Sequence, residues 1–191
     1  MNITKITLIT LAALAATGCA NIHVPAPQPT LANVNASKQL PLGANVGTFK
    51  AAASLNQGAD QSISIRGSNT LKAPEGQTFS AHLRDVLVTE LRAAGKLDSG
   101  SPLLITGELT KSELEAGMAV GTATLGARFQ VTRANTVCLD KELVATSQWE
   151  SSFVGAVAIP LAFNQYAALY PELAGKLLQD TDFRERCAKA P

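Results

Sequence analysis

The sequence has few charged residues, few aromatic residues and only two histidines. Charged residues make up 16% of its 191 residues, aromatic residues make up 5%, and the formal net charge is +1. Such a chain lacks the basic patch of a nucleic-acid binder, and it lacks the charge content of a disordered tail or a coiled coil. Instead, 46% of its residues are apolar, which is typical of one small globular domain with a sizeable core.

The familiar catalytic and cofactor-binding motifs are also missing. The sequence contains no Cys-x-x-Cys pair, no His-Glu-x-x-His helix, no Gly-x-Ser-x-Gly elbow, no Walker loop and no dinucleotide-binding glycine pattern. We therefore predict a protein that is not an enzyme and that holds no cofactor and no metal ion.

Two arrangements of catalytic residue types remain. A hydrolase would place Glu108 and Glu150 about 5 to 9 Å apart on one exposed sheet face. Alternating Glu and Thr is also the ordinary composition of a solvated strand, which we favour. His82 lies next to the apolar stripe of a helix, and we interpret it as a partly exposed surface histidine, not as a catalytic base.

The aromatic residues have two interpretations. Trp149, Tyr166 and Tyr170 could together stack on a sugar, but Trp149 and Tyr166 fall on the apolar sides of their elements. We favour core packing for these side chains.

The clearest regular elements are a helix and two long strands. Apolar residues recur at helical spacing over 78–94, where Gly95 ends the pattern. Residues 103–110 predict a strand, and 122–132 and 137–153 alternate apolar with polar residues as strands with one buried face do.

Shorter elements surround this centre. Residues 46–49 and 62–66 predict early strands, and a second helix begins near Pro160, with a kink or break at Pro171. A short last helix is capped by Asp182 and ends near Cys187. The order β(β)αβββα predicts an α+β, two-layer sandwich, in which helices cover one face of an antiparallel β-meander.

The N-terminus carries an export signal. Lys5 and the apolar stretch after it are too short to span a bilayer, and they end in Ala16-Thr17-Gly18-Cys19. These residues resemble the lipobox of bacterial lipoproteins. The resemblance implies cleavage before Cys19, acylation of Cys19 and, because Ala20 follows it, sorting to the outer membrane of a Gram-negative bacterium. The alternative is an ordinary secretory peptide with an incidental cysteine.

The predicted domain organisation follows from this signal. Residues 1–18 form the lipoprotein signal peptide, 19–43 form the lipidated cysteine with a flexible tether rich in Pro, Asn and Ala, and 44–191 form a single globular domain. In this interpretation His23 is a solvated linker residue. The chain from Cys19 onward has 15 basic and 15 acidic residues, so its membrane contact comes from the lipid and not from charge.

Two further cysteines, Cys138 and Cys187, have two interpretations. In an oxidising periplasm they form a disulfide that fastens the C-terminal tail to the sheet. The alternative is a pair of free thiols too far apart to meet. A metal site is disfavoured because no other soft ligand lies nearby in the sequence.

The apolar run 153–163 also has two interpretations. It is too short to cross a membrane as a helix. We favour a buried link between a strand and its covering helix. The functional alternative is an exposed interface for a partner protein or a lipid chain, formed by Phe153, Val154, Val157 and Ile159.

The chain is similar to small outer-membrane lipoproteins of the YajG type and, more remotely, to the LptE lipoprotein. The likeness lies in the helix 79–94, the strand 122–131 and the segment 147–153 leading into Ile159-Pro160. It is a likeness of element order and pattern over most of residues 60–185, and it implies no functional residue.

Together these features predict a non-enzymatic lipoprotein that faces the periplasm from the outer membrane. Its expected partners are the membrane, through the N-terminal lipid, and an envelope protein assembly that it serves as an interaction or accessory module. The alternative function is a periplasmic lipid- or glycan-binding lipoprotein. Nucleic acid is excluded as a partner by the near-neutral charge.

Overall fold

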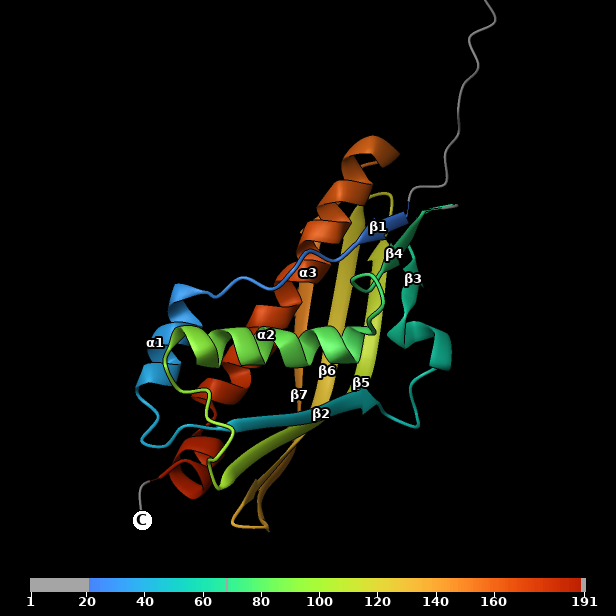
Figure 1. Ribbon diagram of the computed structural model, residues 1–191. Helices are drawn as coiled ribbons and strands as arrows, with labels where there is room; N and C mark the ends of the chain where they lie inside the picture. The colour runs from blue at the N-terminus through green and yellow to red at the C-terminus, as the bar shows by residue number, and fades with distance from the viewer. Residues whose placement is uncertain (1–20, 68, 190–191) are drawn as a thin grey trace, which may run out of the picture.

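A four-stranded sheet forms the main layer of the fold (Figure 1). Its strand order is β2-β5-β6-β7, in which β5, β6 and β7 form an antiparallel meander and β2 pairs with β5 in parallel. The strands are β2 (Asn45–Ala51), β5 (Leu103–Ala116), β6 (Val120–Arg133) and β7 (Thr136–Glu150). The computed structural model describes residues 21–67 and 69–189, so the predicted signal peptide, 1–18, and Cys19 lie outside the described residues.

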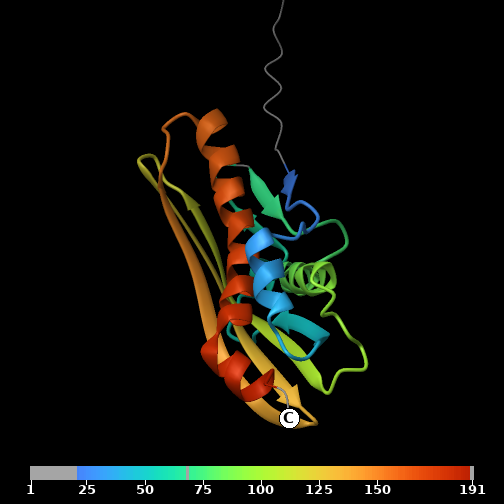
Figure 2. The ribbon, with the colours of Figure 1, turned by 90° about the vertical axis from the view of Figure 1, so that its left-hand side faces the viewer.

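Three helices and a small second sheet complete the fold. The helices are α1 (Leu31–Lys38), α2 (Phe79–Ala93) and α3 (Gly155–Gln179), with a 3-10 turn η1 (Gln57–Asp60) and a π-helical turn η2 (Phe183–Cys187). The second sheet has the order β1-β4-β3 and consists of β1 (Asn21–His23), β4 (Thr70–Lys72) and β3 (Ser62–Ser64). Figure 2 shows the main sheet as one layer with the helices on one side of it, which confirms the predicted α+β two-layer sandwich.

The alternation predicted for the middle strand is confirmed. On the inner face of β6 the apolar side chains are at most 2% exposed, whereas Arg128 and Gln130 point outward and are exposed. The buried set is Ala123, Leu125, Ala127, Phe129 and Val131. Since α3 packs over β6 and β7 while α2 packs over β2, the core lies between this face and the helices.

The helix α2 begins and ends where the sequence predicts. The hydroxyl of Thr78 accepts a hydrogen bond from the Ala81 amide at 3.1 Å, which caps the first turn. Gly95 follows the last turn with a φ of 67°, a left-handed conformation that suits glycine.

The helix α3 differs from the prediction. It begins at Gly155 instead of near Pro160, and it continues through Pro160 and Pro171 without a break. Each proline removes one backbone hydrogen bond. The helix has a buried face on either side of Pro171, which includes Tyr166 before it and Leu173 after it. This packing keeps the helix continuous.

The prediction of a flexible tether over 19–43 is wrong for residues 21–43, the part of this segment that the structure describes. β1 pairs with β4, α1 packs against α2 and α3, and Leu40 is 1% exposed. The prolines of this segment favour extended backbone, but that backbone lies against the protein, since the amide of Val24 donates to the Lys72 carbonyl at 3.0 Å. His23 is exposed, as expected, and its Nδ1 lies 2.7 Å from the Ala73 carbonyl.

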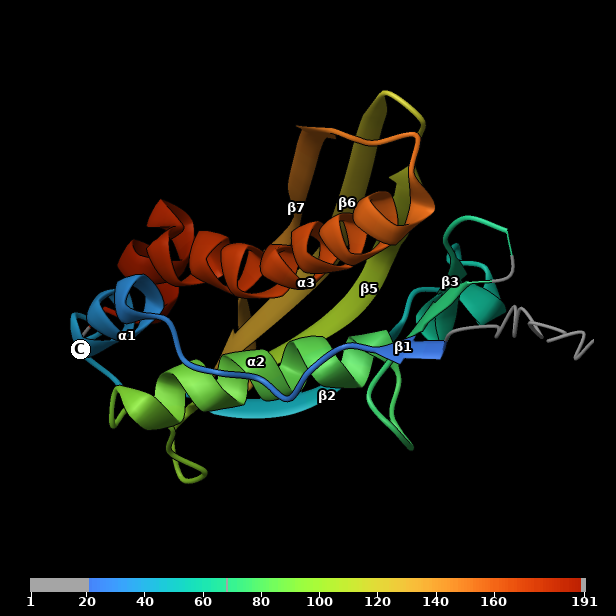
Figure 3. The ribbon, with the colours of Figure 1, turned by 90° about the horizontal axis from the view of Figure 1, so that it is seen from above.

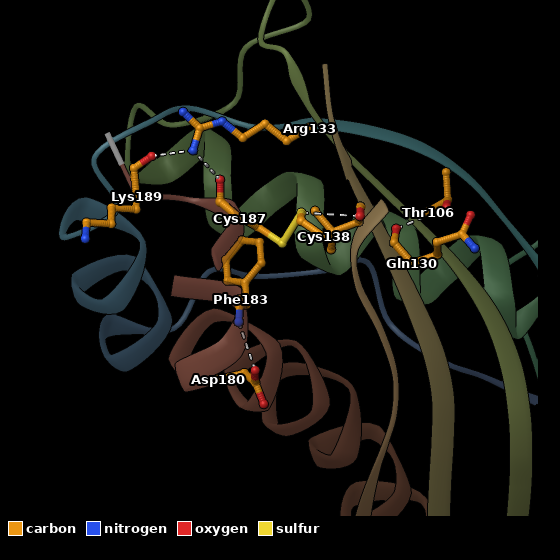
Figure 4. The surroundings of a disulfide bond; sticks show 9 residues. Thr106, Gln130, Arg133, Cys138, Asp180, Phe183, Cys187 and Lys189 are labelled. Carbon is orange, nitrogen blue, oxygen red and sulfur yellow. Dashed lines mark hydrogen bonds between the residues drawn. A yellow bond between two sulfur atoms is a disulfide. The ribbon is translucent and has the colours of Figure 1, made fainter. Parts of the chain in front are cut away.

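A disulfide closes the end of the molecule that holds the C-terminus (Figure 4). It joins Cys138 at the start of β7 to Cys187 of η2, with the two Cα atoms 5.5 Å apart. The predicted cap of the last helical turn, Asp182, is wrong. The carboxylate of Asp180 accepts instead from the Phe183 amide at 3.0 Å, whereas Asp182 receives a hydrogen bond from Lys141.

Candidate functional site

Five exposed apolar side chains gather at one end of the molecule, and we call this surface the apolar tip. It consists of Met118 (69% exposed), Val120 (48%), Phe153 (77%), Val154 (55%) and Val157 (56%). Met118 lies in the turn between β5 and β6, and Val120 is the first residue of β6. The other three come from the start of α3 and the residues before it. An exposed patch of this kind typically marks a contact surface for a protein or a membrane.

Strand register brings the two halves of the apolar tip together. Val120 is paired with Glu150, the last residue of β7, and the Ser151 amide donates to the Ala119 carbonyl at 2.8 Å. The chain therefore leaves β7 directly beside the β5–β6 turn before it enters α3.

Arg66 holds both halves in place. Its guanidinium donates to the Ala116 carbonyl at 2.8 Å and the Gly117 carbonyl at 2.5 Å, both at the β5–β6 turn. It also donates to the Phe153 carbonyl at 3.0 Å. Three carbonyls from two separate segments therefore share one planar donor, which limits the relative movement of these segments.

Three of the four residues predicted for the apolar interface lie on the surface. Phe153, Val154 and Val157 are exposed, which excludes the favoured interpretation that they are buried in a link. Ile159 is half-buried and packs against the core. Its neighbour Ala158 is fully buried, so the segment turns from surface to core within one helical turn.

Sequence reasoning missed Met118 and Val120. The available signal was two large apolar residues on the tip of a hairpin, a position where polar residues are usual. The turn is also tight, because a Cβ atom on Gly117 would lie 2.2 Å from the Val120 carbonyl oxygen.

The outer face of the main sheet carries a second surface, an open polar hollow of about 590 Å³. Lys50 pairs with Glu108 at 3.1 Å, and Arg128 pairs with Asp140. The hydrogen bond between the second pair raises the pKa of Arg128 and lowers the pKa of Asp140. The hollow is lined by Thr48, Lys50, Thr106, Gly107, Glu108, Arg128, Gln130 and Asp140.

The structure does not bring the two candidate carboxylates together. Glu108 is aligned with Arg128 on β6, whereas Glu150 is aligned with Val120 on the same strand. At about 3.3 Å per residue these positions are about 26 Å apart. Glycoside hydrolysis by this pair needs about 5 to 9 Å, so the geometry excludes it.

His82 is a core residue, and the prediction of a partly exposed surface histidine is wrong. Its side chain is 2% exposed and meets the Tyr170 ring edge-on, with the ring centres 4.6 Å apart. Burial lowers the pKa of His82 to about 4, although the nearby charge of Asp85 acts in the opposite direction. The neutral ring lies too deep to reach a substrate.

The tyrosines belong to the same buried cluster. The hydroxyl of Tyr166 is 2.8 Å from the Ser112 hydroxyl and 3.2 Å from the Tyr170 hydroxyl. Burial raises the pKa of Tyr166 to about 12, and it also raises the pKa of Tyr170 well above its ordinary value. Trp149 packs over Gly121, where a Cβ atom would lie 2.2 Å from its ring, so none of the three forms a sugar-stacking platform.

Within residues 21–67 and 69–189, no group of three or more His, Cys, Asp or Glu side chains has the arrangement of a metal site. In the same part of the chain, no helix combines the length and the apolar character needed to cross a membrane.

The fold is shared with a bacterial protein of known structure. Protein XCC0632 from Xanthomonas campestris, of the family described as DUF330, is 18% identical and has a TM-score of 0.54, covering 83% of this chain and 95% of that one. A minor lipoprotein from Acinetobacter baumannii is 12% identical, with a TM-score of 0.45 and coverage of 77% and 96%. No protein-family model and no curated protein matches the chain.

Proposed function

We propose that the protein is a non-enzymatic lipoprotein, anchored through Cys19 in the outer membrane, that acts as an interaction or accessory module of a cell-envelope assembly. The observation that carries the proposal is the lipobox Ala16-Thr17-Gly18-Cys19 directly before a folded body whose first strand begins at Asn21. Such a chain is held at a membrane surface by its lipid.

The outer face of the main sheet is the surface through which this module would contact its protein partner. The helices cover the inner face, whereas the polar hollow lies on the uncovered one. Its side chains, which include Lys50, Glu108 and Arg128, carry both charge signs. A mixed, polar surface of this kind suits a specific but reversible contact.

The non-enzymatic character is supported by the arrangement of the candidate catalytic groups. Glu108 and Glu150 are far apart along the sheet, and His82 is enclosed in the core. General acid–base chemistry needs such groups within reach of one bound substrate.

The test has two steps on the full-length chain in a Gram-negative host. Mass spectrometry of the purified protein should show an acylated N-terminal Cys19, and the Cys19→Ala variant should leave the membrane fraction. An unmodified Cys19, or identical fractionation of the variant, would contradict the anchoring.

The second step locates the partner surface. A photo-crosslinking residue at Gln130, in the hollow, should capture a stoichiometric envelope protein, and this product should depend on Cys19. The same residue at Gln179, exposed at the end of α3, is the matched control. Equal products from both positions, or none from Gln130, would argue against the outer face as the interface.

A further inference from the structure

We infer that the apolar tip inserts into the surface of the membrane that holds the acyl chains of Cys19. The partner of this site is a lipid bilayer, and the inserted groups are Met118, Val120, Phe153, Val154 and Val157. This inference rests on the proposed acylation of Cys19, and it adds a second, independent contact between the protein and the membrane.

The anchor and the apolar tip lie at the same end of the molecule. In Figures 1 and 3 the start of β1, the β5–β6 turn and the start of α3 lie at one end, opposite the C-terminus. β1 begins at Asn21. Only Ala20 separates Cys19 from Asn21 in the sequence. An extended chain spans at most about 3.6 Å per residue, so the link between the proposed anchor and β1 is short.

One side chain connects this end of β1 to the tip. Asn21 is aligned with Thr70 of β4, and the turn before β4 contains Arg66, whose carbonyl accepts from the Asn69 amide at 3.2 Å. Arg66 in turn bonds the backbone of Gly117 and Phe153. The start of the described chain is therefore fixed relative to both halves of the tip.

The composition of the tip suits lipid. The chain has no charged residue between Glu115 and Arg128, and none between Glu150 and Glu172. These two charge-free stretches supply all five side chains of the tip. Charged groups are costly in the apolar part of a bilayer, whereas exposed Phe, Val and Met side chains gain from leaving water.

The short link to Cys19 favours lipid over a protein as the occupant. With a single residue between the proposed anchor and Asn21, insertion of the acyl chains would hold this end of the body against the head-group layer. A folded protein partner at the tip would have to occupy the same narrow space.

The experiment places the only tryptophan of the chain at the tip. Trp149→Phe removes the natural one, and Phe153→Trp or, independently, Met118→Trp introduces a reporter at an exposed position. The matched control is Leu31→Trp on α1, which is 78% exposed but lies away from this end of the molecule. Each acylated protein is reconstituted in vesicles of phosphatidylethanolamine and phosphatidylglycerol with brominated acyl chains, which quench tryptophan on contact.

We expect tryptophan at 153 and at 118 to lose emission and shift to shorter wavelength in brominated vesicles, and tryptophan at 31 to do neither. Vesicle flotation with equal emission at all three positions would overturn the inference while leaving the anchor intact. A crosslink in cells from position 153 to a protein, without quenching in vesicles, would also overturn it. Absence of the acyl mass on Cys19 would overturn the anchor first, and the inference with it.

Discussion

At the residue scale, His82 is the side chain whose charge state is most closely tied to folding. It lies in the core against Tyr170, and no described residue forms a hydrogen bond to its Nδ1 atom. Protonation would place an unpaired charge in that apolar surrounding. Burial therefore lowers its pKa to about 4 in the folded protein, from 6.5 in the unfolded chain.

This pKa difference predicts that acid destabilises the protein. Between pH 6.5 and pH 4 the unfolded chain binds a proton that the folded protein does not, so stability rises with pH in this window and falls as pH is lowered through it. From pH 7.5 to pH 5 we expect the free energy of unfolding to fall by about 2 kcal/mol. Urea unfolding at both pH values measures this. In the His82→Leu variant, the free energy of unfolding should differ much less between the two pH values. An unchanged difference would show that another group is responsible.

Gly107 lies beneath an aromatic ring. It is aligned with Phe49 of the neighbouring strand, and a Cβ atom at position 107 would lie 2.4 Å from that ring. Gly107→Ala should therefore destabilise the protein by about 1 to 3 kcal/mol, because the ring must move within a packed core. Gly100→Ala is the control, since its Cβ would meet only the Asp98 carboxylate at 3.4 Å. Equal urea midpoints for the two variants would contradict the prediction.

At the scale of elements, α1 depends on a carboxylate from another helix. Glu90 of α2 is fully buried, and its carboxylate accepts from the Thr30 amide and hydroxyl and from the Asn33 side chain, all at 3.0 to 3.1 Å. A negative charge at a helix N-terminus is stabilising. The α1 sequence has no marked apolar stripe, so local periodicity does not predict this helix.

Removing the charge of Glu90 should loosen α1. In Glu90→Gln the side chain keeps only one acceptor oxygen, and its new amide NH2 group faces the donor groups of Thr30 and Asn33. We expect a loss of about 2 kcal/mol in the free energy of unfolding and faster amide exchange in α1. Glu172→Gln, which affects only the exposed pair with Lys176, should change stability by less than about 0.5 kcal/mol. Similar losses for both variants would refute the capping role.

The elements that could be predicted from the sequence are those with a periodic apolar face. The helix α2 and the strand β6 fall within a few residues of their predicted bounds, because Leu83 and Phe129 belong to such faces. Phe153 and Val157 are apolar too, but their exposure depends on where the neighbouring sheet ends. Burial of Glu90 depends on the position of Thr30, far away in sequence. Neither arrangement is encoded in local periodicity.

At the scale of the whole molecule, the disulfide fastens the C-terminal turn to the start of β7. Cys138 and Cys187 are 49 residues apart in sequence, and in the chain-entropy model closing such a loop contributes about 4 kcal/mol. Reducing the wild type should lower its melting temperature. The double variant Cys138→Ala, Cys187→Ala should have a lower melting temperature than the oxidised wild type, and the reductant should not change it. A wild type that is insensitive to complete reduction would contradict this.

The strand β6 links the apolar tip to the polar hollow without interruption. Val120 belongs to the tip and Arg128 lines the hollow, about 26 Å further along the strand. Because β6 is paired on both sides, it can neither shorten nor stretch. With the tip in the bilayer, the hollow stands at most about 26 Å above the head groups. If the protein acts as proposed, a partner held in the same membrane must present its own binding surface within this distance of the head groups in order to contact the hollow.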